Sequence, residues 1–236
     1  EEVNMTKSLY SSRVSGVICS LAMETKDTSH FQQFSNNNIP LVFVDRVPKD
    51  FNTFRVVIDN YTAGYKATKH LIEQGCKRIA HMTAGAEFGN LYNERKRGYI
   101  DALADYGLPL REELIINLKA MTYDAGVKAC NKLFGLKSPP DGLFAPGDIL
   151  AVSAVQTAKK KGIKVPQDFA VIGFNNDPIS EIIEPNITTI THPAEKMGKA
   201  AANIVIDTIE FHKEEEAKEI TFLNTEVLVR ESSKKV

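Results

Sequence analysis

The sequence predicts an α/β fold, in which helices cover parallel sheets and the chain divides into two similar lobes. Short apolar runs alternate with longer amphipathic segments along most of the chain, as in βα units with right-handed crossovers. The 236 residues also divide naturally into two lobes of roughly 100 residues. A single open sheet of about eight strands is the alternative arrangement.

The composition is that of an ordinary globular protein, with 43% hydrophobic and 25% charged residues. The 29 basic and 30 acidic side chains nearly cancel, and no Lys/Arg block marks a nucleic-acid surface on this chain. Cys19, Cys76 and Cys130 form no CxxC pair, which argues against a zinc site or disulfide framework and indicates a reducing compartment. Neither a membrane-spanning run nor a signal-peptide pattern is visible.

The first part of the chain predicts three strands and two helices. The apolar runs predict strands at 14–20, 41–45 and 55–59, and helices are expected at 3–12 and 29–37. Pro40 ends the second helix and leads into the strand that begins at Leu41.

From residue 60 the alternation is regular. Helices are expected at 60–73, 93–106, 124–134 and 148–161, and strands at 78–82, 114–118, 142–145 and 169–174. Asn60 and Asp148 are expected to cap the helices that they open, while Gly75, Gly107 and Gly162 stop helices.

The last part begins with a helical turn at 180–183 and a β-rich link at 187–191. Pro193 is expected at the first position of a long helix. Its apolar stripe from Met197 to Thr208 predicts packing inside a lobe, with neighbouring residues lending part of a dimer face. Lys213 to Glu219 is expected to be a solvated linker, and 220–229 is expected to be extended.

Polar side chains gather at the ends of the predicted strands. Asn175, Asn176 and Asp177 follow the strand at 169–174, and ligands bind at the carboxyl ends of strands in open parallel sheets. Asp45, Asp59, Asn60 and Asp148 hold similar positions. Each alone fits a capping role, but as a set with Arg95 they offer the hydrogen bonds that a neutral polyhydroxylated ligand requires.

No motif predicts catalysis, a cofactor or a metal. The stretch at 85–90 lacks both phosphate-loop patterns and is expected to be an ordinary βα loop. The five histidines are scattered without metal-ligand spacing, and no GxSxG elbow is present. His81, on a buried strand, is expected to be a satisfied core histidine rather than a base.

A series of motifs runs almost from end to end of the chain. They are IPLVFVDR at 39–46, VIDN at 57–60, a helix-to-strand stretch at 67–80, RKRGY at 95–99, PDGLFA at 140–145, the stretch at 162–174 that ends in VIGF, PNITTI at 185–190 and VRES at 229–232. In this order they resemble the effector-binding core of the LacI/GalR family of bacterial transcription regulators. That family shares its fold with type I periplasmic sugar-binding proteins.

The resemblance implies two Rossmann-like lobes of the type I periplasmic-binding-protein kind, joined by a three-strand hinge. Residues 1–59 and 192–221 would form the N-terminal lobe, incomplete at its start, and 60–191 and 222–236 the C-terminal lobe. The hinge crossings would lie near Asp59, near Thr191 and in the region from Lys213 to Glu219.

The resemblance also implies a function without catalysis. A small polar effector such as a sugar would enter the interlobe cleft and contact Arg95, Asp148, Asn175 and Asn176, with Asn60 nearby and Met121 or Tyr123 as an apolar platform. The protein would be a cytoplasmic homodimer that binds operator DNA through an N-terminal helix-turn-helix domain absent from this chain.

Two departures from the family pattern affect the expected site. Asn175 and Asn176 stand where the family usually carries two acids, and Pro146-Gly147 replaces its common Ala-Asn. Two other functions remain as alternatives. A secreted sugar-binding protein of a transport system would share the cleft, and an α/β enzyme would require an acid–base pair or a phosphate loop.

Overall fold

The computed structural model describes residues 1–49, 51–84, 90–211 and 220–234. The chain divides into two compact units, one formed by Glu1–Asp59 and Pro193–Asn224 and the other by Asn60–His192 and Thr225–Val236. It therefore passes from one unit to the other after Asp59, His192 and Asn224. The third passage follows the last strand of the first unit rather than the run from Lys213 to Glu219, which lies outside the described residues.

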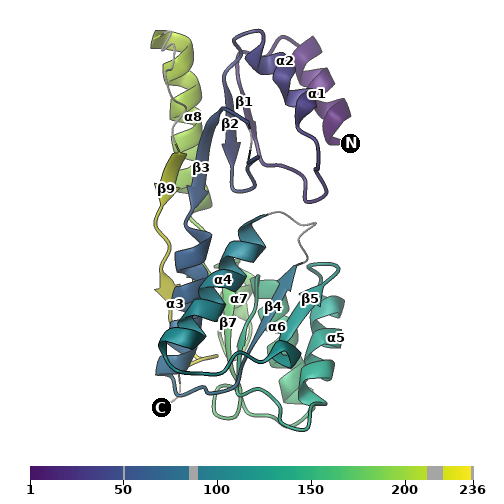
Figure 1. The fold of residues 1–236 in the computed structure, drawn as a ribbon, viewed down its shortest axis with the longest axis vertical. Coiled ribbons are helices and arrows are strands. Elements are labelled where there is room, and N and C mark those ends of the chain that lie inside the picture. The colour runs from purple at the N-terminus through teal and green to yellow at the C-terminus, as the bar shows by residue number, and fades with distance from the viewer. Residues whose placement is uncertain (50, 85–89, 212–219, 235–236) are drawn as a thin grey trace. The chain divides into compact units, whose positions relative to one another are not determined.

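The first unit contains a four-stranded sheet in the order β1-β2-β3-β9. Its strands are β1 (Val17–Cys19), β2 (Leu41–Val44), β3 (Phe54–Ile58) and β9 (Ile220–Leu223), all parallel to their neighbours. Helices α1 (Glu2–Ser11), α2 (Gln32–Ser35) and α8 (Ala194–Phe211) belong to this unit. Figure 1 shows α1 and α2 on one side of the strands and α8 on the other.

The two faces of this sheet carry separate cores because neighbouring strand residues point to opposite faces. Phe43 packs with Phe31 and Phe34 in one cluster. Val42, its neighbour in sequence, packs with Met197 and Ala201 of α8 in the other. The stripe that begins at Met197 is therefore core inside this unit, as predicted.

Several predicted boundaries in the first unit are wrong. The helix predicted at 29–37 is a 3₁₀ turn, η1 (Ser29–Phe31), followed by the single turn of α2. The strand predicted at 14–20 has only the three residues of β1. Helix α8 begins at Ala194, so Pro193 precedes the helix instead of opening it.

The second unit contains a six-stranded sheet in the order β10-β8-β7-β6-β4-β5. Its strands are β4 (Ile79–Ala84), β5 (Ile115–Leu118), β6 (Gly142–Phe144), β7 (Ala170–Asn175), β8 (Thr188–Thr191) and β10 (Val227–Leu228). All pairings are parallel except the one between β8 and β10, which is antiparallel. The predicted extended segment at 220–229 thus supplies a strand to each sheet.

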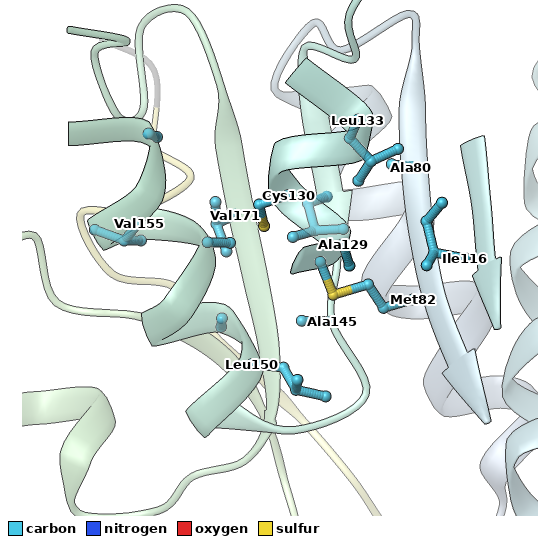
Figure 2. Close-up of a cluster of buried hydrophobic side chains, with 14 of the residues drawn as sticks. Ala80, Met82, Ile116, Ala129, Cys130, Leu133, Ala145, Leu150, Val155 and Val171 are labelled. Carbon is cyan, nitrogen blue, oxygen red and sulfur yellow. The ribbon is translucent and has the colours of Figure 1, made fainter. Parts of the chain in front are cut away.

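In the part of this unit that the structure describes, five helices and a 3₁₀ turn precede or connect these strands. They are α3 (Asn60–Glu73), α4 (Asn90–Asp105), η3 (Glu112–Leu114), α5 (Tyr123–Phe134), α6 (Asp148–Lys160) and α7 (Ile179–Ile182). Figure 2 shows the core that α5 and α6 form with one face of the sheet, where side chains such as Met82, Leu133 and Val171 converge. The central strands β4, β6 and β7 are buried on both faces, as expected of a parallel sheet covered on both sides.

The opposite face holds His81, which is fully buried. Its ring stacks on Tyr99 and Phe144, with centroid separations of 5.0 and 4.6 Å. Nδ1 lies 3.1 Å from the carbonyl oxygen of Phe144, to which it donates, whereas Nε2 has no hydrogen-bond partner among the described residues. His81 is thus a core histidine as predicted, but only one of its two nitrogens is satisfied. Burial lowers its pKa to about 3, so the ring is neutral in the folded protein.

Candidate functional site

Arg95, on the first turns of α4, is held at the carboxyl edge of the six-stranded sheet. Its side chain is buried, with the residue only 4% exposed. Nε donates to Oδ1 of Asn60 at 2.8 Å, and Nη1 donates to the carbonyl oxygen of Pro146 at 3.2 Å. Arg95 therefore connects the start of α3 with the loop that follows β6.

The guanidinium of Arg95 also lies over an aromatic ring. Its central carbon is 3.4 Å from the centroid of Phe174, near the end of β7, and 5.5 Å from that of Tyr92. A cation over a buried ring is attracted by the ring quadrupole. The sequence places Phe174 next to Asn175, so this contact brings the charge of Arg95 to the strand end that carries the two amides.

Two glycines allow α3 and α4 to approach closely enough for these contacts. A Cβ atom on Gly64 would lie 2.3 Å from the carbonyl oxygen of Arg95, and one on Gly98 would lie 2.2 Å from that of Tyr61. No side chain fits in either position without moving a helix backbone. The close crossing of the two helices therefore sets the distance between Asn60 and Arg95.

Asp148 is fully buried and does not cap α6, contrary to the prediction. Gly147 holds the cap position, and Asp148 is the first residue of the helix. Its Oδ2 accepts from the backbone N–H of Asp177 at 2.7 Å, and its Oδ1 accepts from the hydroxyl of Thr189 at 2.7 Å. The carboxylate thus joins α6 to the loop after β7 and to β8.

The environment of Asp148 favours its neutral form. Burial raises the pKa of this carboxyl to about 6, and the nearby Asp177 carboxylate acts in the same direction. The Thr189 hydroxyl and the amides of Asp177 and Phe174 oppose the rise because they donate to the carboxylate. The charge of Asp148 therefore changes close to neutral pH.

Asn175 and Asn176 are half-buried and have left-handed backbones, with φ of 106° and 59°. Asn enters this region more readily than most residues, which gives a backbone reason for amides at this pair. Nδ2 of Asn175 lies 3.4 Å from Oδ2 of Asp177. Asn176 donates its N–H to the Thr189 hydroxyl at 3.2 Å, and its Oδ1 accepts from Nη2 of Arg230 at 2.8 Å.

The structure therefore brings five of the seven predicted site residues into one connected set. We call this set the polar edge; it comprises Asn60, Arg95, Asp148, Asn175 and Asn176. Asn60 is itself the first residue of α3 rather than the residue before it, so its predicted cap position is one residue too late. The stretch at 85–89, predicted to be a βα loop, lies outside the described residues.

Among the described residues, no hydrogen bond or ring contact joins Met121 or Tyr123 to the polar edge. Both are half-buried and pack against the core between α5, α6 and the sheet. Tyr123 begins α5, after the cap Thr122, and its hydroxyl donates to Oε1 of Gln156 on α6 at 2.5 Å. Their expected role as an apolar platform remains a prediction.

Sequence reasoning missed three residues that organise the polar edge. Phe174 supports Arg95, Thr189 bonds to both Asp148 and Asn176, and Arg230 bonds to Asn176. Thr189 lies in the PNITTI motif and Arg230 in the VRES motif. Membership of these motifs was the only sequence signal that pointed to either residue. Their partners lie 13 to 54 residues away in the chain.

The described part of the chain offers no group of three His, Cys, Asp or Glu side chains that could hold a metal ion. Within the same part, no helix combines the length and the apolar character needed to cross a membrane.

Comparisons with known proteins place the chain in a family. Residues 68–233 match the periplasmic binding protein-like domain. The chain is 31% identical over 224 residues to the HTH-type transcriptional repressor PurR of Actinobacillus pleuropneumoniae serotype 3 (strain JL03), covering 95% of this chain and 66% of that protein. It is 34% identical over 171 residues to the repressor CytR of Escherichia coli (strain K12), covering 72% of this chain and 50% of CytR. The chain thus spans between half and two thirds of the length of these relatives.

Solved structures agree in fold. A complex of the transcriptional regulator CelR with cellobiose has a TM-score of 0.85 at 31% identity, covering 97% of this chain and 69% of that chain. A LacI family regulator from Enterococcus faecium with bound ribose has a TM-score of 0.84 at 25% identity, covering 99% of this chain and 84% of that chain. The chain therefore belongs to the periplasmic binding protein-like family, as an effector-binding core of the LacI/GalR type.

Proposed function

We propose that this chain senses a small polar metabolite, a sugar or a similar hydroxylated compound, at the polar edge. The observation that carries the proposal is that buried and half-buried polar groups gather at this edge: Asn60 bonds to Arg95, Arg95 lies over Phe174, and Asp148 and Asn176 both bond to Thr189. Burying polar groups costs free energy unless each of them is hydrogen-bonded. A fold that gathers several of them at one edge is therefore expected to employ them in binding a polar ligand. The polar edge also lies at the end of the sheet where ligands bind in this architecture.

The residues of the polar edge differ in what they offer a ligand. Asn60, Asn175 and Asn176 are half-buried, and their amides can donate and accept hydrogen bonds with hydroxyl groups. Arg95 supplies a guanidinium held in one orientation, which favours bidentate recognition. Asp148 is fully buried with both oxygens occupied, so we assign it to ordering the loop at Asn175–Asp177. Met121 or Tyr123 would provide the apolar surface.

A sugar is supported by what is bound to two of the related structures, namely cellobiose and ribose. The names of the curated relatives leave other polar effectors open. Because Asn175 and Asn176 replace acids here, we expect hydrogen bonding by amides to decide which hydroxylated ligand fits.

We further propose that the whole protein is a cytoplasmic, homodimeric repressor that binds operator DNA through a domain outside this chain. Support comes from the curated relatives, which are named HTH-type transcriptional repressors. The same names do not favour a transport protein. We propose no catalytic activity.

Thermal shift with the full-length protein tests effector binding. The panel would contain D-ribose, cellobiose, cytidine and adenine, each titrated to saturation. A ligand that binds only the folded state raises the midpoint in a concentration-dependent manner, and we expect this for at least one sugar. If none of the four compounds, or adenine alone, raised the midpoint, the proposed ligand class would be wrong.

Selection of bound sequences from a randomised DNA pool tests the regulatory part of the proposal. A dimeric repressor should enrich a sequence with two-fold symmetry, because operator symmetry mirrors protein symmetry. A pool that stays unenriched at low salt would argue against DNA binding.

A further inference from the structure

The C-terminal arm, residues 225–234, is built into the sheet beside the polar edge. Its strand β10 pairs with β8. Beyond it, the Ser232 hydroxyl donates to the Val171 carbonyl at 2.6 Å and accepts from the Thr188 N–H at 2.9 Å. Ser232 and Ser233 are fully buried. The arm is thus anchored to β7 and β8 on both sides of its residue Arg230.

The guanidinium of Arg230 bonds to four groups in the segment that runs from β7 to β8. Nη1 donates to the Ser180 hydroxyl at 3.2 Å and to the Ile187 carbonyl at 2.9 Å. Nη2 donates to Oδ1 of Asn176 at 2.8 Å and to Oε1 of Glu181 at 2.6 Å. One planar group therefore holds the start, the helical turn and the end of this segment.

The contact with Asn176 matters because of its backbone. Two successive residues with positive φ, Asn175 and Asn176, cost free energy and persist only where their surroundings determine the conformation. Here the N–H of Asn176 is held by Thr189, its side chain is held by Arg230, and the carbonyl of Asn175 accepts from the N–H of His192 at 3.3 Å. Of these three ties, only Arg230 uses the Asn176 side chain.

We infer that Arg230 is a positioning residue for the effector site, acting through Asn176. The arm fixes the left-handed turn at Asn175–Asn176, so that Asn175 presents its amide to the ligand while the Oδ1 of Asn176 is committed to Arg230. This inference rests on the proposed function for the ligand, but the ordering of the turn by Arg230 can be measured without any ligand.

Hydrogen exchange on the full-length protein tests the ordering directly. In Arg230→Gln, the backbone amides of residues 174–177 should exchange roughly tenfold faster, the effect of losing a hydrogen bond to a charged group. Strand β4 reports global opening and should keep its protection. Asn176→Ala should produce the same local effect, and combining both changes should add little, because they remove the same interaction.

Two variants serve as controls. Glu181→Gln removes the ion pair of Arg230 but leaves its bond to Asn176. Since the Glu181 side chain is 63% exposed, protection of the amides of residues 174–177 should be unchanged. Asn176→Asp keeps an oxygen toward Arg230 and tolerates the left-handed backbone, so it should preserve protection. If the amides of residues 174–177 exchanged at the wild-type rate in both Arg230→Gln and Asn176→Ala, Arg230 would not order the turn.

Calorimetry with D-ribose and cellobiose then tests the link to binding. Whichever sugar binds the unchanged protein should bind Arg230→Gln roughly tenfold more weakly, with Glu181→Gln near wild type. Equal affinity in Arg230→Gln would overturn the positioning role. If neither sugar bound the unchanged protein, the sugar proposal would fail, whereas the exchange data would still decide whether Arg230 orders the turn.

Discussion

The guanidinium of Arg95 lies over the ring of Phe174, with its central carbon 3.4 Å from the ring centroid. At the same time Arg95 donates to Asn60 on α3 and to the carbonyl of Pro146 after β6. One buried cation thus joins three elements at the carboxyl edge of the sheet. This arrangement depends on a planar group with several donors, which a lysine does not have.

Arg95→Lys should therefore weaken both the fold and ligand binding. The substitution leaves the Asn60 amide or the Pro146 carbonyl without its donor, which costs roughly 1–3 kcal/mol of unfolding free energy. Urea denaturation of the full-length protein measures this loss. Affinity for the sugar found by thermal shift should fall roughly tenfold or more. Arg97→Lys is the matched control, since Arg97 lies on the same helix with a 60% exposed side chain. Equal stability of the two variants would contradict the role given to Arg95.

Gly173→Ala should disturb the site through Asp148. A Cβ atom at Gly173 would lie 2.1 Å from Oδ1 of Asp148, so the carboxylate must move away from Thr189. Overpacking of this kind costs roughly 1–3 kcal/mol, measurable by urea denaturation. Gly198→Ala provides the control, because nothing lies within 4 Å of its added Cβ and Ala is favoured over Gly in a helix by about 0.8–1.0 kcal/mol. Similar effects of both changes would argue against the clash.

Asp148→Asn should remove a pH dependence of stability. The folded pKa of about 6 exceeds the ordinary 3.8, so the folded state keeps a proton that the unfolded state releases between these values. This contribution to stability is present below about pH 4, declines as the pH rises to 6 and is level above it. Each pKa unit corresponds to about 1.4 kcal/mol. We expect the free energy of unfolding of wild type, relative to Asp148→Asn, to decrease between pH 4 and pH 7 in urea titrations. A constant difference would contradict the raised pKa.

His81→Phe should make the protein less sensitive to acid. The folded pKa of about 3 lies below the ordinary 6.5, so the unfolded state takes up a proton first as the pH falls. Stability from this group is complete above pH 6.5 and is lost as the pH decreases toward 3, the opposite slope from Asp148. Phe retains the stacking on Tyr99 and Phe144. Acid unfolding followed by circular dichroism should have a lower midpoint in His81→Phe. An unchanged midpoint would show that His81 does not contribute to acid unfolding.

The order of strands and helices was readable from the sequence because apolar runs and amphipathic periods are local properties. From Asn60 to Phe174, every predicted helix and strand is present. One predicted boundary in this stretch is wrong because the residue at it can serve two roles. Asp148 has the residue type of a cap, but its carboxylate bonds to Asp177 and Thr189, and Gly147 takes the cap position. Residue type alone does not predict which hydrogen-bond donor a carboxylate will bind.

The C-terminal part shows the same limit at the level of topology. An extended segment at 220–229 was predictable, but its division into β9, which pairs with β3, and β10, which pairs with β8 in the other sheet, was not. These pairings join strands separated by many residues, and alternation along one strand carries no information about which partner it meets.

The α/β class, the succession of elements and the clustering of polar residues at strand ends are readable from the sequence alone, because each depends on periodicity and residue type within a short window. Which of those polar groups meet depends on the tertiary structure. Arg95 bonds to Asn60 and lies over Phe174. Asp148 bonds to Thr189, and Asn176 bonds to Arg230. Such contacts are set by sheet order, helix crossing and burial, through which residues far apart in the chain become neighbours.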